Sequence, residues 1–168
     1  MSTHRVTRAL ITIGIIAVLA WSIDQAVKAW VRATIPMYGA IYPVPFAARF
    51  FRLTHLTNTG VAFGMFQGSE MVNLLVLAVL LVSIVLYARH LPWQRPLVQV
   101  AAGLQLGGAL GNLVDRLRLG YVTDYLDFFV RWGDRVFHYP PFNLADSFIV
   151  VGVGLLLVAL WREEKQPT

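Results

Sequence analysis

The stretch FNLADSFIVVGVGLLLVALW, residues 142–161, decides the architecture of this chain. From Ser147 to Trp161 it contains no charged side chain. A helix needs about 20 predominantly apolar residues to cross the hydrocarbon core of a bilayer. The stretch therefore predicts a membrane-spanning helix that carries a carboxylate, Asp146, close to its beginning.

Three earlier stretches have the same character, at about residues 9–31, 71–89 and 96–114. Hydrophobic residues make up 57% of the 168-residue chain and charged residues only 14%, with a mean hydropathy of +0.62, which is outside the range of ordinary soluble domains. We expect a four-helix transmembrane bundle that forms a single integral membrane domain over residues 1–168. The first span is expected to be retained, because no Ala-x-Ala cleavage site closes it.

The two long connections, about residues 32–70 and 115–141, are expected to lie on one side of the membrane. Residues 49–57 are rich in β-branched and aromatic side chains, and the second connection has aromatic runs on both sides of Gly133-Asp134, which suits a two-residue hairpin loop. Basic residues are denser in the short segments beside the termini, which favours cytoplasmic termini and an extracytoplasmic sheet.

Several function classes are excluded by composition. The absence of cysteine rules out a disulfide framework, a thiolate nucleophile and a Cys-ligated metal. The four histidines show no metal-binding spacing, so neither a metal nor another cofactor is expected. The net charge of +5 includes no basic block, so nucleic acid is not an expected partner, whereas the membrane surface is.

Five aspartates lie between the third and fourth spans, at positions 115, 124, 127, 134 and 146. Asp134 is expected to be a turn residue, and Asp127 is expected to point to water from the outer face of a strand. Asp115 suits an ion pair or a network at a helix end. Asp146 has no such explanation, because a carboxylate inside an apolar span costs several kcal/mol, roughly 2.5–3.5 on insertion scales.

Spacing alone does not choose a partner for Asp146 among these aspartates, but Asp124 is a candidate. In a strand over residues 121–128, the two-residue period places Asp124 on the same face as Val122, Leu126 and Phe128, and this apolar setting raises a carboxyl pKa. Two neighbouring carboxyls cannot both ionise easily, so one keeps a proton while the other activates water. A proton or ion relay also uses buried acids, and the residue pattern leaves that alternative open.

Other polar and small residues have simpler interpretations. Asp24 and Lys28, four residues apart, are expected to form a salt bridge that fixes the end of the first span. Gly103, Gly107 and Gly111 are spaced for close helix packing, and Gly108 lies with Asn112 on an adjacent face that could line a cavity.

Five motifs, in order along nearly the whole chain, resemble the bacterial lipoprotein signal peptidases, or signal peptidase II. They are Asp24-Gln-Ala-Val-Lys28, Asn58-Thr-Gly-Val-Ala-Phe63, Gly107-Gly-Ala-Leu-Gly-Asn-Leu-Val-Asp-Arg116, Val122-Thr-Asp124 and Phe142-Asn-Leu-Ala-Asp-Ser147. Residues 131–138 match the family pattern least well.

The resemblance implies an intramembrane aspartyl endopeptidase of the bacterial inner membrane. Such an enzyme removes the signal peptide of a diacylglyceryl-modified prolipoprotein, cleaving N-terminal to the lipidated cysteine, and a cyclic peptide such as globomycin is an expected inhibitor. The implied catalytic residues are Asp124 and Asp146. Supporting or substrate-binding positions are Asn58, Gly108, Asn112, Arg116 and Asn143, with structural roles for Asp24, Lys28 and Asp115. A small extracytoplasmic β-cradle and a lid-like amphipathic helix are also implied.

Two alternatives from other classes stay open at this point. One is a small proton-coupled membrane carrier that uses Asp24, Lys28 and Asp146. The other is an assembly subunit whose Gly103, Gly107 and Gly111 face binds a partner helix.

Overall fold

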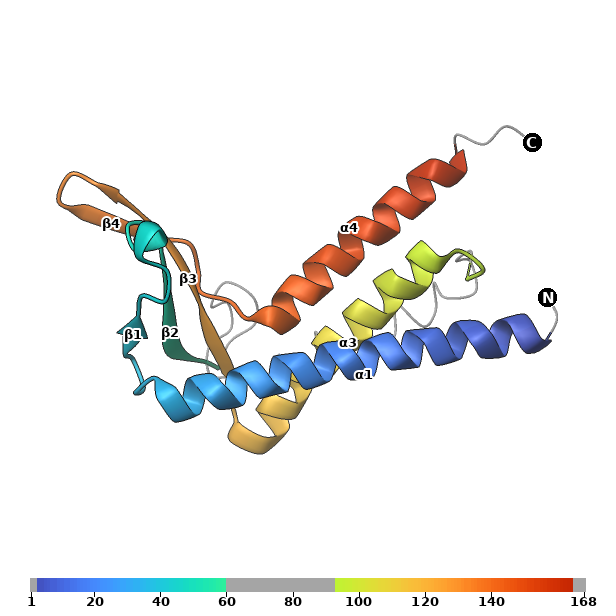
Figure 1. Cartoon of the computed structure of the whole chain (residues 1–168), viewed down its shortest axis with the longest axis horizontal. Helices are drawn as coiled ribbons and strands as arrows, with labels where there is room; N and C mark the ends of the chain where they lie inside the picture. Colours follow the sequence, from blue (N-terminus) through green and yellow to red (C-terminus); the bar gives the residue numbers. More distant parts are fainter. Residues whose placement is uncertain (1–2, 60–92, 165–168) are drawn as a thin grey trace.

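The computed structural model describes residues 3–59 and 93–164. Three long helices, α1 (Thr3–Thr34), α3 (Pro96–Leu119) and α4 (Leu144–Glu164), form the body of the molecule. Each is long and apolar enough to cross a membrane. Figure 1 shows α3 between α1 and α4 and a small sheet at one end of the helices. The chain is therefore a membrane protein with a small sheet, while the expected span at residues 71–89 lies outside the described residues.

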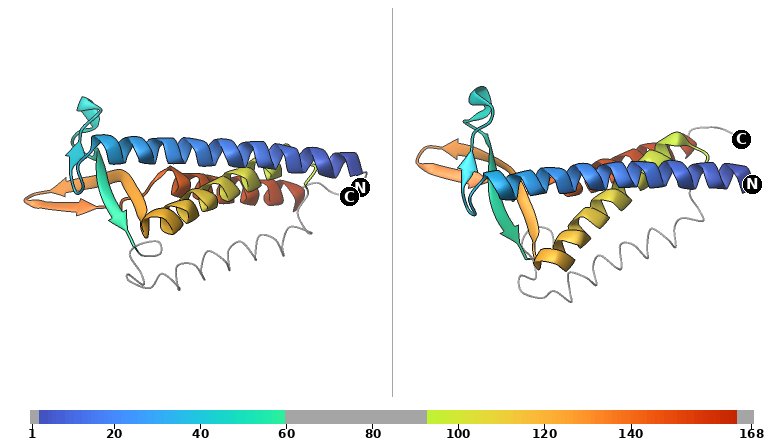
Figure 2. Two further views of the ribbon diagram at one scale, coloured as in Figure 1. Left: turned by 90° about the horizontal axis from the view of Figure 1, so that it is seen from below. Right: turned by 60° about the horizontal axis from the view of Figure 1, so that its bottom comes forward.

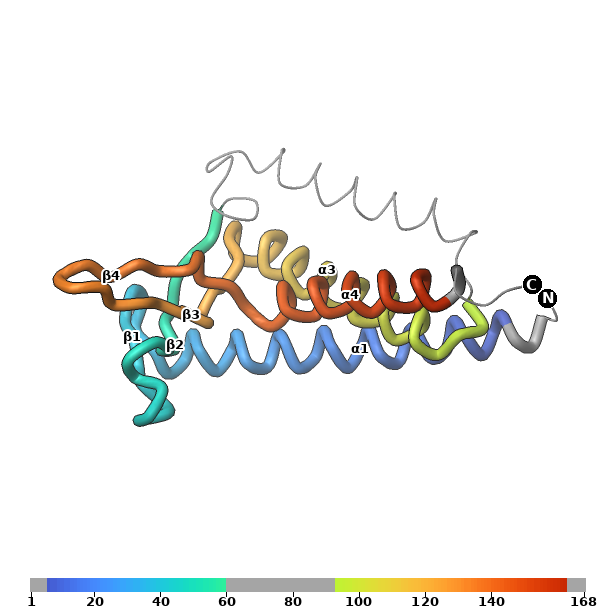
Figure 3. Tube along the Cα trace, turned by 90° about the horizontal axis from the view of Figure 1, so that it is seen from above, coloured from blue at the N-terminus to red at the C-terminus, as the bar shows by residue number. Residues whose placement is uncertain are grey.

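The helices α1 and α3 both run toward the sheet, and α4 runs back from it (Figures 1 and 2). The beginning of α1 and the end of α4 consequently lie at the same end of the bundle, far from the sheet. The polypeptide leaves the sheet at the end of β2 (Phe51–Asn58), whereas α3 begins at the opposite end of the bundle (Figure 3).

Close packing of the helices depends on glycine. A Cβ atom added to Gly107 would lie 2.6 Å from the carbonyl oxygen of Ala17, and one added to Gly103 would lie 2.6 Å from the Cβ of Ile16. On the adjacent face of α3, a Cβ at Gly108 would collide with the carbonyl oxygen of Ala145 in α4. The small-residue face of α3 is thus occupied by α1 inside this chain, which removes the reason to expect a partner helix there.

The spans are apolar outside and polar inside. Large apolar side chains of α1 and α4, including Leu10, Ile15 and Val150, are exposed, whereas Asp24, Lys28, Asn112 and Asp115 are buried. This distribution is the reverse of a soluble protein and suits helices whose outer surface faces lipid.

The sheet has four antiparallel strands in the order β1-β2-β3-β4, with β1 at Ala40–Ile41, β3 at Val122–Trp132 and β4 at Arg135–His138. Trp132 pairs with Arg135, which leaves Gly133 and Asp134 as a two-residue turn with a φ of +57° at Gly133, so the predicted hairpin is confirmed. Within residues 35–59 the described helical structure is a short 3-10 turn, η1 (Pro45–Ala47), and the expected lid-like helix is not seen there.

A sharp turn joins α3 to β3, at the end of the helices where the sheet lies. Gly120 has a φ of +79°, and its N–H donates to the carbonyl of Arg116, ending α3. The adjoining core contains Val31 from α1, Ile35 immediately after α1, and Tyr125 from β3. This core holds the beginning of α4 against the sheet, because Leu144 also packs on it.

Candidate active site

The first turn of α4 is built by a reciprocal pair of hydrogen bonds. The backbone N–H of Asp146 donates to Asn143 Oδ1 at 3.0 Å, and the backbone N–H of Asn143 donates to Asp146 Oδ2 at 3.1 Å. This is a capping box, in which the residue before the helix and the third helical residue satisfy each other's backbone donors. The sequence prediction began this span at Phe142, whereas the helix begins at Leu144 and Asn143 is its cap.

The remaining donors at this helix end are satisfied by other elements. The N–H of Leu144 donates to the Tyr125 hydroxyl at 3.1 Å, and the N–H of Ala145 donates to Asp24 Oδ1 at 3.0 Å. Because free helix N–H groups are costly away from water, these bonds fix α4 against both β3 and α1. The position of Asp146 is thereby determined by three separate parts of the chain.

Asp124 is buried on β3, with 3% of its surface exposed. Its Oδ1 accepts a hydrogen bond from Asn143 Nδ2 at 2.7 Å, and its Oδ2 accepts one from Asn58 Nδ2 at 2.8 Å. Burial, followed by the nearby negative charge of Asp146, raises the pKa of Asp124 to about 7, and the two amide hydrogen bonds oppose this shift. Asn143 therefore connects the two aspartates directly.

Asp146 is only partly buried, so its carboxylate is the more accessible of the two. Asn112 Nδ2 donates to Asp146 Oδ1 at 2.8 Å, and the Asn112 oxygen accepts from Lys28 Nζ at 2.9 Å. The lysine ammonium can only donate, so it binds the oxygen of the Asn112 amide, and the NH₂ group of that amide then faces Asp146. Lys28 thus orients the residue that holds Asp146.

Lys28 is the centre of a buried charge cluster. Its Nζ lies 2.9 Å from Asp24 Oδ2 and 3.2 Å from Asp115 Oδ2, and all three side chains are at most 1% exposed. Gln25 donates to both carboxylates, and Arg32 lies 3.8 Å from Asp115 Oδ1. The cluster contains two negative and two positive side chains, so their mutual attraction offsets the cost of removing the charges from water.

Two further expected site residues lie on α3. Arg116, one turn after Asn112, interacts electrostatically with Asp146 and Asp124. Gly108, one turn before Asn112, lies against the backbone of Ala145. It therefore allows α3 to pack closely on α4, whereas the sequence suggested that it could line a cavity. The structure therefore brings together every expected site residue that was named on α1, α3, β2, β3 and α4.

Asp127 does not point to water as the sequence prediction had it. It is 1% exposed, and it accepts hydrogen bonds from Arg52 Nε at 2.6 Å and His138 Nδ1 at 2.8 Å. Strand alternation correctly sends it to the face opposite Asp124, but side chains from β2 and β4 cover that face. The prediction was wrong because alternation in one strand does not reveal what neighbouring strands place over it.

Sequence reasoning also missed Tyr125 and Thr123, which support the site from β3. The Tyr125 hydroxyl accepts the first N–H of α4, while Thr123 contacts both Asp115 and Arg32. The available signal was the Val122-Thr-Asp124 motif, which contains Thr123 and immediately precedes Tyr125. Among residues 3–59 and 93–164, no group of three or more His, Asp or Glu side chains could hold a metal ion.

Comparison with known proteins gives one consistent result. Residues 16–162 match the family model of signal peptidase (SPase) II. The chain is 41% identical over 157 residues to the lipoprotein signal peptidase of Nitratidesulfovibrio vulgaris, with 91% of this chain and 90% of that protein covered. It is 37% identical over 154 residues to the lipoprotein signal peptidase of Symbiobacterium thermophilum, with coverages of 92% and 97%.

Two solved structures of bacterial membrane enzymes, both obtained by the in meso method, have the same fold. The first superposes with a TM-score of 0.78 at 29% identity, covering 94% of this chain and 93% of the other. The second has a TM-score of 0.69 at 29% identity, with coverages of 89% and 92%. These matches lend no support to the proton-coupled carrier that the residue pattern left open. The chain belongs to the signal peptidase II family and is a membrane-bound protease.

Proposed function

We propose that this signal peptidase, which removes signal peptides from prolipoproteins, cleaves the peptide bond with an aspartate dyad formed by Asp124 and Asp146. The observation that carries the proposal is the hydrogen-bonding of both aspartates to Asn143 at the start of α4. No cysteine is present as an alternative nucleophile. A dyad of acids needs neither a covalent intermediate nor a metal.

The two aspartates have different roles in this proposal. Asp124 is buried and has a pKa raised to about 7, so a large fraction of the molecules carry a proton on Asp124 at neutral pH. Asp146 is more accessible, accepts two hydrogen bonds and lies in the first turn of a helix, where the backbone dipoles stabilise a negative charge. Asp146 is therefore the general base, and Asp124 is the general acid.

The reaction follows from this division. Asp146 takes a proton from water as the water oxygen attacks the scissile carbonyl carbon, and Asp124 donates its proton to the carbonyl oxygen. When the tetrahedral intermediate collapses, the C–N bond breaks and the leaving amine takes the proton from Asp146. Asp124 regains its proton from the hydroxyl that becomes the new carboxyl group.

Asn58 and Arg116 are proposed to hold the substrate backbone. Asn58 in β2 donates a hydrogen bond to Asp124, and Arg116 in α3 interacts electrostatically with both aspartates, so both side chains belong to the surroundings of the dyad. A substrate held between them by hydrogen bonds is oriented for attack. The proposed cleavage point is the bond N-terminal to a diacylglyceryl-modified cysteine, as the family resemblance implies.

The proposed topology has four spans in one integral membrane domain, with residues 71–89 as the second span. Two described ends support it, because β2 leaves the sheet at one end of the bundle and α3 begins at the other. We infer that both termini are cytoplasmic in the bacterial inner membrane, with the dyad and the sheet at the extracytoplasmic border. There the acyl chains of the substrate stay in lipid while water reaches Asp146.

The decisive experiment is a gel-shift cleavage assay with the purified protein and a diacylglyceryl-modified prolipoprotein. We expect cleavage by the wild type, no cleavage by Asp124→Asn or Asp146→Asn, and inhibition of the wild type by globomycin. Asp134→Asn is the matched control, because Asp134 lies in the exposed hairpin turn. Retained cleavage in either dyad variant would refute the aspartic mechanism while leaving the family intact.

A further inference from the structure

The hairpin formed by the distal part of β3 and by β4 has two different faces. Its register pairs Val130 with Phe137 and Trp132 with Arg135, and residues directly opposite each other share a face. The next pair, Phe128 and Tyr139, is joined by a hydrogen bond from the Tyr139 N–H to the Phe128 carbonyl. One face, which we call the aromatic face, therefore consists of Phe128, Val130, Trp132, Arg135, Phe137 and Tyr139.

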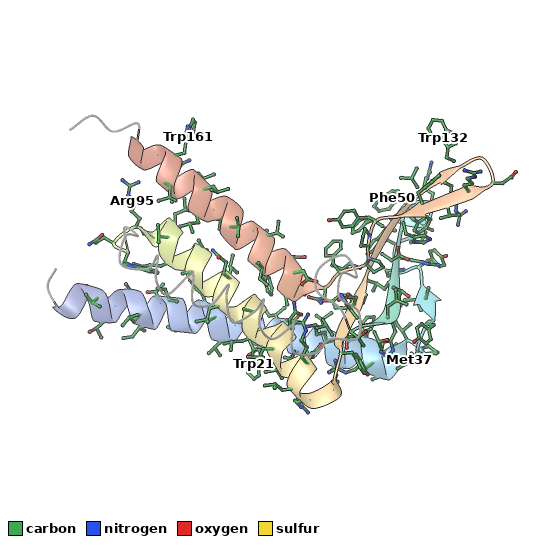
Figure 4. All side chains as sticks on the ribbon, turned by 180° about the vertical axis from the view of Figure 1, so that it is seen from behind. Trp21, Met37, Phe50, Arg95, Trp132 and Trp161 are labelled. Atoms are coloured by element: carbon green, nitrogen blue, oxygen red, sulfur yellow. The ribbon has the colours of Figure 1, made fainter. Side chains whose placement is uncertain are left out.

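The aromatic face is exposed along its whole length. Trp132 is 78% exposed, Val130 61%, Phe137 57% and Tyr139 55%. In Figure 4, Trp132 stands out from the ribbon near the distal end of the hairpin. A row of large apolar side chains on a two-stranded ribbon is poorly suited to water, because such ribbons are at best marginally stable without a covering layer.

On the opposite face of the hairpin, the charged side chains are paired with one another. Asp127 binds Arg52 and His138 there, and the guanidinium groups of Arg52 and Arg131 lie 5.7 Å and 5.5 Å from the centre of the buried Phe129 ring. Because the charged groups that form the ion pair and the cation–π contacts are hydrophilic, that face is suited to contact with water. The hairpin is consequently an amphipathic ribbon with one wet face and one apolar face.

The aromatic face belongs to the same face of β3 as Asp124. Strand alternation places Asp124, Leu126, Phe128, Val130 and Trp132 on one side, and the register shift in this part of the sheet lies between Leu53 and Leu56 of β2. The Phe128 ring stacks on Phe142, immediately before the cap of α4. The face thus extends without interruption from the dyad at the end of the membrane-spanning bundle.

We propose that the aromatic face docks on the surface of the membrane in which the bundle is embedded, with its aromatic side chains among anionic phospholipid headgroups. Tryptophan and tyrosine are the residues that prefer the headgroup level of a bilayer. Arg135 on the aromatic face and Arg131 on the opposite face are both exposed. Asp134 is the one acid among residues 128–139, and the preceding Asp127 is already paired with Arg52, so this segment carries a net positive charge that complements an anionic surface. Docking covers the apolar row and keeps the ion-paired face in water.

The test uses the absence of native cysteine, which makes any introduced thiol unique. A nitroxide label is attached to Val130→Cys on the aromatic face and, as a matched control, to Val136→Cys on the polar face. Both valines are exposed, at 61% and 50%. Each full-length protein is reconstituted into vesicles of phosphatidylcholine with phosphatidylglycerol, and collisions of the label with oxygen and with a water-soluble nickel chelate are measured by electron paramagnetic resonance.

We expect the label at position 130 to lose most of its nickel collisions and gain oxygen collisions, while the label at 136 remains accessible to nickel. Replacing Arg135 by Gln, or omitting phosphatidylglycerol, should reduce the docked fraction, by about fivefold in the docking equilibrium for this arginine. Arg131→Gln, on the opposite face, should reduce it less. The measurement does not depend on turnover and can be repeated in Asp146→Asn, so its failure is distinguishable from failure of the proposed chemistry.

Three outcomes would overturn the proposal. Equal nickel accessibility at positions 130 and 136 would show that the ribbon stands free in water. Protection at 130 that ignores both phosphatidylglycerol and the arginines would exclude recognition of anionic headgroups. Protection that develops only when a prolipoprotein is added would make the aromatic face a peptide-binding surface.

Discussion

Asn143 donates a hydrogen bond to Asp124 Oδ1 through its side chain and another to Asp146 Oδ2 through its backbone, so one residue determines the relative placement of both acids. The same side chain accepts the N–H of Asp146 and begins α4. The stability of the helix start and the geometry of the dyad therefore depend on a single residue.

Variants of Asn143 should separate these two roles. Asn143→Ala loses the cap and the bond to Asp124, so we expect it to destabilise the protein by about 0.5–2 kcal/mol and to abolish cleavage. Asn143→Asp retains a good cap but replaces a donor to Asp124 with a third acid. At acid pH, where the new carboxyl is protonated, it should be more stable than Asn143→Ala, and at neutral pH it should still lose cleavage because a third carboxyl is buried against Asp124. Equal loss of stability in both variants at acid pH would contradict the capping role.

The raised pKa of Asp124 predicts the alkaline limb of activity. Asp124 must hold a proton in the proposed mechanism, so cleavage should fall as the pH rises through about 7. The mechanism also needs one ionised acid, so activity should fall again at low pH, which gives a bell-shaped profile whose apparent values belong to the pair. A flat profile of kcat/KM from about pH 4 to 9 would show that neither acid titrates in the reaction.

Stability should show the same ionisation. Because the pKa of Asp124 is higher in the folded protein than the value of about 4 in an unfolded chain, the folded state binds the proton more tightly. The free energy of unfolding should therefore decrease as the pH rises from about 4 to 7. Asp124→Asn should remove this part of the pH dependence in thermal unfolding, whereas Asp134→Asn should leave it unchanged.

Removing Asp146 should lower the pKa of Asp124. The negative charge of Asp146 is the second-largest cause of the raised value, after burial. In Asp146→Asn, titration of the Asp124 carboxyl by isotope-edited infrared spectroscopy should give a lower midpoint than in the wild type. An unchanged midpoint would mean that the two acids do not interact.

Loss of the Lys28 charge should strongly lower the free energy of unfolding. Lys28→Met leaves Asp24 and Asp115 buried around a missing cation, and breaking such a pair typically costs about 3–5 kcal/mol. Adding Asp24→Asn to the same chain should recover part of the stability. Arg118→Met, at an exposed position on α3, is the control and should leave thermal unfolding unaffected.

The glycines of the helix interfaces should differ in tolerance. Gly107→Ala forces a methyl group to 2.6 Å from the Ala17 carbonyl oxygen, so α1 and α3 must separate, at a cost of about 1–3 kcal/mol. A methyl group at Gly154 meets no atom within 4 Å, so Gly154→Ala should be neutral or slightly stabilising. Similar unfolding temperatures in the two variants would argue against tight packing at Gly107.

Apolar run length and local residue chemistry were readable from the sequence alone. The stretch at 142–161 needs a bilayer, the Gly133-Asp134 pair needs a hairpin, and Asp24 with Lys28 needs a salt bridge at four-residue spacing. Each of these depends on residues close together in the chain, so the physical requirement is visible locally.

Contacts between distant segments were decided only by the tertiary structure. Asp24 satisfies the N–H of Ala145, Lys28 orients Asn112 toward Asp146, and Arg52 with His138 covers Asp127. None of these pairs has a local spacing signal, because burial of a polar group depends on which elements pack over it. The chain by itself determined that acids must be buried at a membrane border, and the packing of α1, α3, α4 and β3 decided which partners surround each one.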